Sequence, residues 1–169
     1  MAVDSFKFLP GILATVYQMS DQRPELPIPW TPLALPLAEC TFGLVTSGGL
    51  YPRDIEPPFD VEREKAEPSW GDPTYRILPV EIDPTRIGAS HLHINPRDVL
   101  RDPNILLPVA RFKELAADGC IGGLAIEAFS FMGFQGFPPD LRPWVEVYGP
   151  AVAERLKAQG ANCVLLTTA

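Results

Sequence analysis

Proline content is the feature that most limits the folds open to this chain. The 169 residues include 20 prolines, about 12% of the chain against about 5% in an average protein. They cluster in residues 24–36, 52–58, 68–84 and 137–150. Because proline lacks a backbone N–H and restricts the residue before it, these stretches are neither continuous helix nor central strand. The sequence therefore predicts a few regular elements joined by long ordered loops, which are commonly binding surfaces or subunit contacts.

Short apolar runs alternate with helical patterns between the proline clusters. The patterns predict strands over 42–46, 87–91, 121–131 and 162–168, and helices over 109–118 and from 145 or 150 to 159. The passages 105–131 and 121–168 are typical of strand–helix–strand units, which imply parallel strands with right-handed crossovers. The predicted fold class is α/β, with a mostly parallel sheet, flanking helices and long proline-rich loops. Residues 1–28 are expected to form an N-terminal extension or helix, and residues 29–169 a single α/β domain.

Composition narrows the class of protein. Hydrophobic residues make up 46% and charged residues 21%, which is typical of a globular domain. The formal net charge of −7 and the pI near 4.8 argue against nucleic-acid binding, which needs a positive surface. No apolar run reaches the roughly 18–20 residues of a membrane span, and the N-terminus lacks the basic region of a secretory signal. We expect a cytoplasmic protein that binds neither membrane nor nucleic acid.

Three cysteines, Cys40, Cys120 and Cys163, lie far apart in the sequence. No CxxC pair is present, so the cysteine spacing indicates neither a zinc knuckle nor a local redox dithiol. In a reducing cytosol the plainest interpretation is three ordinary thiols, two of them beside or inside apolar strands.

The two histidines of the chain, His91 and His93, follow a predicted strand. Residues two apart face the same side of an extended chain, so the pair could share a metal ion with a third ligand such as Cys40. Alternatively, one imidazole bonds to a loop while the other faces solvent, or the pair binds a substrate carboxylate or donates a proton. We take His91 and His93 as candidate catalytic residues and assign no metal.

The segment Thr46, Ser47, Gly48 and Gly49 follows the first buried strand. Its hydroxyls and backbone N–H groups are suited to an anion-binding nest. It contains neither the GK[ST] of a phosphate-binding loop nor a GxGxxG that opens a helix. A plain tight turn is an equally good interpretation, and we carry the four residues forward as candidate substrate-binding residues.

Two further positions are candidates for substrate binding. Met132 and Gly133 end the third predicted strand in a glycine-rich loop, where a turn or a site is equally consistent with the residues. Asn104, together with Asp102, precedes the helix expected over 109–118. Short polar side chains at that place favour a helix cap, with substrate binding as the alternative.

Charged residues in the loops offer a weaker signal. Asp72, Arg76 and the neighbours Arg53 and Asp54 could hold a small zwitterion, because arginine suits bidentate recognition of a carboxylate. Most such charges are solvated surface. On these grounds alone the chain is an α/β domain with a loop-rich face suited to a ligand.

Several phrases occur together in a characteristic order from about residue 29 to the end. They are PWTPLALPLAEC (29–40), FGLVTSGGLY (42–51), PPFD (57–60), GDPTYRILP (71–79), SHLHIN (90–95), DPNILLPVARFKELAADGCIG (102–122), FSFMG (129–133) and AVAERLKAQGANCVLLTTA (151–169). In order and spacing the chain resembles the selenoprotein B family of glycine, sarcosine, betaine and D-proline reductases.

The resemblance implies an oxidoreductase of amino-acid metabolism that reductively cleaves a carbon–nitrogen bond in a small amino acid or betaine. In that family a pyruvoyl-bearing partner subunit captures the substrate amine. In the glycine-type members the selenolate of selenoprotein B then attacks the α-carbon, and the product passes to a small selenoprotein A. The resemblance places His91, the Thr46–Gly49 turn, Asn104 and Met132–Gly133 near the pocket.

The redox motif of the family is not among these residues. The resemblance places a selenocysteine or cysteine directly after the final strand, just beyond Ala169, and Cys163 inside that strand is a poor substitute. Selenocysteine is encoded by UGA, which is normally a stop codon. We therefore hypothesise that this sequence was truncated at a UGA codon directly after Ala169. No redox cofactor is expected within the chain itself. The exposed final strand and the proline loops suggest association, including with further copies of the chain.

Two other functions remain open at this point. One is a non-catalytic binding or assembly module of the same fold. The other is a small metal-dependent hydrolase or lyase that uses His91 and His93. The substrate is not determined by the residues, because glycine, sarcosine, betaine and proline differ by contacts that the sequence does not place.

Overall fold

The computed structural model describes residues 11–12, 14–15, 31–92 and 94–169. It divides the chain into two units, residues 1–32 and residues 33–169. In the first unit the described residues 11–12 and 14–15 are helical, and the hydroxyl of Thr15 donates to the carbonyl of Gly11 at 2.9 Å.

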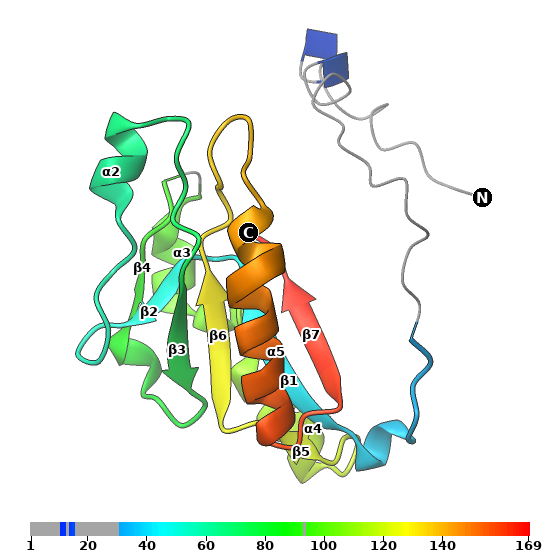
Figure 1. The fold of residues 1–169 in the computed structure, drawn as a ribbon. Helices are drawn as coiled ribbons and strands as arrows, with labels where there is room; N and C mark the ends of the chain where they lie inside the picture. The colour runs from blue at the N-terminus through cyan, green and yellow to red at the C-terminus, as the bar shows by residue number, and fades with distance from the viewer. Residues whose placement is uncertain (1–10, 13, 16–30, 93) are drawn as a thin grey trace. The chain divides into compact units, whose positions relative to one another are not determined.

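A five-stranded mixed sheet forms the centre of the second unit (Figure 1). Strand β1 (Thr41–Thr46) pairs in parallel with β7 (Cys163–Thr167) along one side. Along its other side it pairs in parallel with β5 (Gly123–Leu124) and β6 (Glu127–Phe131). Strand β3 (Tyr75–Pro79) pairs antiparallel with β6 and closes that edge. The fold is therefore the predicted α/β class with a mostly parallel sheet.

The two faces of the sheet carry separate hydrophobic cores, because successive strand residues point to opposite sides. Leu44, Leu78 and Ala128 pack on the face covered by α3 (Pro96–Arg101) and α4 (Val109–Ala117). Val45 of β1, Phe129 of β6 and Ile77 of β3 pack toward α5 (Gly149–Ala158) on the opposite face. In Figure 1, α5 crosses the front of the sheet and α4 lies behind it.

The predicted helices are confirmed with small changes. The helix expected over 109–118 is α4, and it ends before Gly119, whose φ of 70° lies in the left-handed region. Phe112 packs inward against the core, whereas Leu115 of the same helix is exposed. The helix expected near 145–159 begins as one π-helical segment, η5 (Trp144–Tyr148), which continues into α5 before the left-handed Gly160.

Two predictions need correction: the single strand over 121–131 and the strand–helix–strand unit over 105–131. The strand expected over 121–131 is broken into β5 and β6, because Ala125 turns into the core while Ile126 is 73% exposed. The segment 105–108 is no strand: η4 (Pro103–Ile105) and a turn occupy it, since Pro103 and Pro108 lack the N–H groups of a ladder. The unit at 105–131 is therefore not a strand–helix–strand unit, whereas β6–α5–β7 is one.

A second, two-stranded sheet lies beside the main one. The strand expected over 87–91 is the shorter β4 (Ile87–Ala89), and it pairs antiparallel with β2 (Leu50–Pro52). Two short 3-10 helices, η2 (Leu37–Glu39) and η3 (Pro84–Arg86), lie outside the sheets. A short α-helix, α2 (Val61–Ala66), also lies outside them and is capped by Asp60. No described helix is long and apolar enough to cross a membrane.

A bidentate ion pair fastens α5 to β6, and it makes the stability of the unit depend on pH. Arg155 donates to both carboxylate oxygens of Glu127 at 2.7 Å, and the amide of Gln159 donates to the same carboxylate at 2.6 Å. These hydrogen bonds, chiefly those of Arg155, lower the pKa of Glu127. A group with a lowered pKa stabilises the fold above its ordinary pKa and loses that contribution as the pH falls through the lowered value.

We therefore expect Glu127→Gln to lower the free energy of unfolding by about 0.5 kcal/mol at neutral pH, a modest value because Arg155 is nearly half exposed. The difference from the wild type should vanish in acid, where Glu127 is protonated. Urea unfolding at both pH values measures it. Glu62→Gln, which breaks the exposed pair with Lys65, is the matched control and should change little at either pH. If Glu127→Gln lowered the free energy of unfolding equally at both pH values, the assignment of pH-dependent stability to Glu127 would be wrong.

Candidate functional site

The candidate site lies where three parallel strands end. The carboxyl ends of β1, β6 and β7 meet at one edge of the sheet, and the C-terminus of the chain lies at this end (Figure 1). The segments that follow these strands are Thr46–Gly49, Met132–Gly133 and residues 168–169. An isolated antiparallel bridge between Gly48 and Met132 joins the first two segments. Ligands of open parallel sheets commonly bind at this edge.

The backbone N–H groups of the turn after β1 have acceptors within the protein. The N–H of Ser47 donates to the carbonyl of Thr167 at 3.0 Å, and that of Gly49 donates to the carbonyl of Phe131 at 2.9 Å. The N–H of Gly48 donates to the hydroxyl of the buried Thr46 at 3.2 Å. Two of these N–H groups thus link the end of β1 to β7 and β6, and the third closes the turn itself.

Gly49 brings the second sheet to this edge. Its φ of 63° suits glycine, and a Cβ there would lie 2.7 Å from the carbonyl oxygen of Ser90. The N–H of Ser90 donates to the carbonyl of Gly49 at 2.8 Å. This close contact between the β1 turn and the end of β4 fixes the position of the next residue, His91.

His91 and Ser47 meet around Gly133. A Cβ built on Gly133 would lie 3.2 Å from Nε2 of His91, 3.2 Å from the carbonyl oxygen of Ser47 and 3.5 Å from its Oγ. The hydroxyl of Ser47 also accepts the N–H of Ala169 at 3.2 Å. Four chain segments therefore converge at one point, which we call the strand-end site: Ser47, His91, Gly133 and Ala169.

The other predicted site residues take different places. Met132 is fully buried, and its carbonyl accepts a hydrogen bond from the side chain of Gln135 at 2.9 Å, so its side chain belongs to the interior. His93 lies outside the described residues. Among the residues that the structure describes, no three side chains of metal-binding type are grouped to hold a metal ion.

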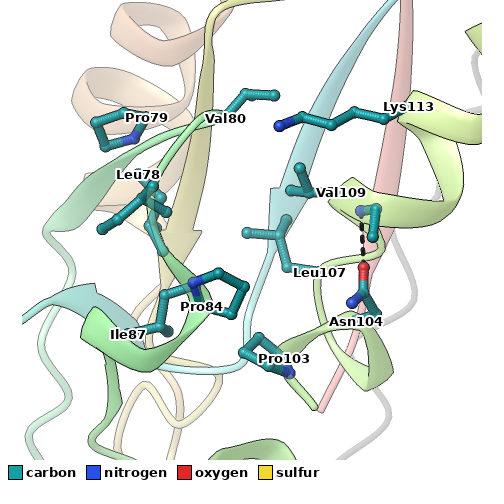
Figure 2. A pocket seen from close by; sticks show the side chains of 12 residues that line it. Leu78, Pro79, Val80, Pro84, Ile87, Pro103, Asn104, Leu107, Val109 and Lys113 are labelled. Carbon is teal, nitrogen blue, oxygen red and sulfur yellow. Dashed lines mark hydrogen bonds between the residues drawn. The ribbon is translucent and has the colours of Figure 1, made fainter.

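Asn104 lines a separate small pocket on the α4 side of the sheet (Figure 2). Its side-chain oxygen accepts the N–H of Ala110 at 2.8 Å, and its amide donates to Asp102 at 2.8 Å. It thus caps the start of α4, as the sequence favoured. The pocket of about 130 Å³ is mostly apolar, and the ammonium group of Lys113 at its rim is paired with Glu81 at 2.8 Å. The structure does not bring Asn104 together with the strand-end site.

Gln135 is a buried polar residue beside the site that the sequence analysis did not single out. Its amide nitrogen donates to the carbonyls of Asp72, Met132 and Phe134 at 2.9–3.0 Å. It thereby ties the loop after β6 to the loop before β3. Its place between Gly133 and Gly136 marked a tight loop, but no local signal identified its distant partner at Asp72.

Arg76 and Asp72, which the sequence suggested as holders of a zwitterion, serve the fold instead. Both are more than 90% buried, and Nη2 of Arg76 lies 3.6 Å from the carboxylate of Asp72. The guanidinium also donates to the carbonyls of Pro57 and Pro58 at 2.7 and 3.1 Å. Their hydrogen-bonding capacity is largely used within the protein.

The cysteines lie at the wrong end of the sheet for this site. Cys40 precedes β1 and Cys163 begins β7, so both sit at the amino ends of the parallel strands. Cys40 is buried, its thiol contacts the carbonyls of Leu35 and Pro36, and burial raises its pKa, with Cys163 adding to the rise. A raised pKa disfavours the nucleophilic thiolate. Neither residue is suited to be the nucleophile of the strand-end site.

Comparison with known proteins decides the family. Residues 14–169 match the family model described as glycine/sarcosine/betaine reductase selenoprotein B. The chain belongs to this family. It is 32% identical over 138 residues to the D-proline reductase subunit gamma of Acetoanaerobium sticklandii, a match that covers 82% of this chain and 52% of that protein.

A second relative is named glycine reductase complex component B subunit gamma, from Carboxydothermus hydrogenoformans. It is 29% identical over 142 residues, which cover 83% of this chain and 31% of the relative. The chain thus spans about half the length of the first relative and about a third of the second. No solved structure matches the chain.

Proposed function

We propose that this chain is the scaffold part of a reductase subunit that cleaves a carbon–nitrogen bond of a small amino acid or betaine. Membership of the selenoprotein B family supports the reaction class, and the names of both relatives describe subunits of reductases. The proposed partners are a pyruvoyl-bearing subunit and a small selenoprotein A. A cytoplasmic location accords with this chemistry, since a nucleophilic selenolate or thiolate persists in a reducing compartment.

The observation that carries this proposal is the hydrogen bond between Ser47 and Ala169. The Ser47 hydroxyl accepts the N–H of Ala169 at 3.2 Å, while the same residue borders the space beside Gly133 and His91. A residue joined to Ala169 would therefore start at the strand-end site. The absent side chain of Gly133 allows His91 and Ser47 to come this close, because a Cβ there would lie only 3.2 Å from Nε2 of His91 and from the carbonyl oxygen of Ser47.

Each residue of the strand-end site has a proposed task. The selenocysteine that the family resemblance places after Ala169 would supply the nucleophile, and a partner's pyruvoyl group would hold the substrate amine. Ser47 holds the backbone that carries the nucleophile. Gly133 allows the close approach of His91 and Ser47, and His91 offers Nε2 as a hydrogen-bond donor to an anion or as a proton donor to a departing amine.

A cysteine appended directly after Ala169, followed by a short glycine tail, tests the proposal on this chain. Cys120→Ser and Cys163→Ser remove the two less buried thiols. The pH dependence of alkylation of the appended cysteine gives its pKa. We expect a value below the ordinary value of about 8.5, because His91 and Ser47 can donate hydrogen bonds to the thiolate.

His91→Ala in the same background separates the proposal from a general effect of the C-terminus. The pKa of the appended cysteine should then rise toward the ordinary value. Circular dichroism of both proteins confirms that the fold is retained. An ordinary pKa that does not change on His91→Ala would refute the strand-end site as the place of the nucleophile.

A further inference from the structure

The outer edge of β7 is open. Among the described strands β7 pairs only with β1, so one row of its backbone N–H and C=O groups has no strand beside it. Leu165 packs into the core on the α4 face, whereas Val164 and Leu166 point the other way and are 49% and 71% exposed. Natural proteins rarely leave an apolar edge strand uncovered, because it templates pairing with another chain.

An apolar groove runs between this strand and α5, and we call it the β7 groove. It encloses about 410 Å³. Its apolar lining comes from Phe131, Trp144, Val152, Leu156, Val164 and Leu166. The indole N–H of Trp144 is buried and has no acceptor among the described residues. A contiguous apolar surface of this kind marks an interaction site.

The topology of the sheet determines what fits the β7 groove. Strands β6 and β7 lie on opposite sides of β1, and α5 connects them across the front face (Figure 1). This is a right-handed crossover, the hand that nearly all parallel strand–helix–strand connections share. A further crossover of the same hand, starting at the end of β7, places its helix on the α5 face over Val164 and Leu166. Its strand then falls on the open edge of β7.

The lengths of the relatives supply the occupant. The matched stretch covers 52% of the D-proline reductase subunit gamma and 31% of the glycine reductase component B subunit gamma. Both relatives thus contain much chain that has no counterpart here. We propose that the β7 groove is the seat of an amphipathic helix and a following parallel strand from that remaining part of the family protein.

This inference rests on the sheet topology and on family membership, not on the redox role of the strand-end site. Completion of the sheet would cover Val164 and Leu166 and pair the open edge of β7. It would also enclose the strand-end site on the side of β7. The site and the groove share Ser47, and Thr46 and Thr167 also line the groove. The occupant would therefore shield the strand-end site from water, which strengthens the electrostatic interactions within it.

The test mixes this chain with a polypeptide that comprises the part of the Acetoanaerobium sticklandii subunit outside the 138 matched residues. Size-exclusion chromatography with light scattering measures stoichiometry, and hydrogen exchange measures protection of the amides in β7. We expect a one-to-one complex in which the amides of residues 163–167 exchange much more slowly. Calorimetric titration gives the affinity.

Leu166→Lys should weaken this binding by about tenfold or more, because it places an ammonium group in an apolar contact. Val164→Lys should act in the same direction. Ile126→Lys is the matched control, because Ile126 is a similarly exposed aliphatic residue (73%) that does not line the β7 groove. The affinity of this variant for the added polypeptide should be unchanged.

Three results would overturn the inference. They are absence of a complex, a complex without protection of β7, and protection that grows with the concentration of this chain alone, which would show that a second copy occupies the groove. The appended-cysteine experiment reads the site without the added polypeptide. Failure of one experiment therefore leaves the other result interpretable.

Discussion

Replacing Arg76 by methionine is expected to lower the free energy of unfolding by about 3 kcal/mol or more. The guanidinium is 8% exposed, donates to the Pro57 carbonyl at 2.7 Å and to the Thr74 hydroxyl at 2.8 Å, and lies 3.6 Å from Asp72. It also stacks on the Phe59 ring at 4.1 Å. Methionine fills much of this volume but leaves the buried carboxylate of Asp72 without its positive partner and the carbonyls of Pro57 and Pro58 without the donor from Arg76. Urea unfolding measures the loss.

A surface arginine is the control for this substitution. Arg111 pairs with Glu114 at 2.7 Å, but both side chains are more than half exposed. Arg111→Met should therefore change the free energy of unfolding by no more than about 0.5 kcal/mol. Similar small changes for both variants would contradict the structural role assigned to the Arg76–Asp72 pair and would return it to consideration as a substrate-binding pair.

Replacing His91 by alanine is expected to lower the turnover of the assembled reductase by about a hundredfold or more. The expectation follows from the proposed function, in which Nε2 of His91 faces the space beside Gly133. Because His91 is only partly buried, its replacement should alter the free energy of unfolding little. The assay uses the full-length subunit with its partner subunits and compares kcat with KM, since a proton donor acts mainly on kcat.

Two further variants are compared with His91→Ala. Arg86 directly precedes β4, whereas His91 follows it. Arg86→Ala removes only an exposed ion pair with Asp54, so the turnover of the reductase should stay near the wild-type value. Ser47→Ala should reduce activity less than His91→Ala, because Ser47 positions the backbone of Ala169 without acting on the substrate. Wild-type turnover in His91→Ala would remove this residue from the proposed mechanism.

Those parts of the fold that depend on local pattern were predictable from the sequence. The apolar runs that became β1 and β7 were recognisable because neither run alternates with polar residues, as is typical of strands in a parallel sheet. Gly119 and Gly160 stand just after the two predicted helices, and both adopt the left-handed backbone that suits glycine at a helix end. The alternation of strand and helix then led to a mostly parallel sheet, and the collinear phrases led to the family.

Features that depend on contacts between distant segments were not predictable. The break between β5 and β6 arises where Ala125 enters the core, a choice that tertiary packing makes. The contact of Ser47 with Ala169 joins residues 122 positions apart, and Gln135 binds a carbonyl 63 positions away. Asn104 had the same local signals for a cap and for a ligand contact, and only its bond to Ala110 shows the cap.

The most direct test of the central claim is mass spectrometry of the protein purified from the organism that makes it. The decisive tryptic peptide begins after Lys157 and contains β7. The proposed function predicts that this peptide continues past Ala169 into a selenocysteine, seen by the isotope pattern of selenium, or into a cysteine. A peptide that ends at Ala169 with a free carboxylate would contradict the claim that these strand ends carry the nucleophile of a reductase.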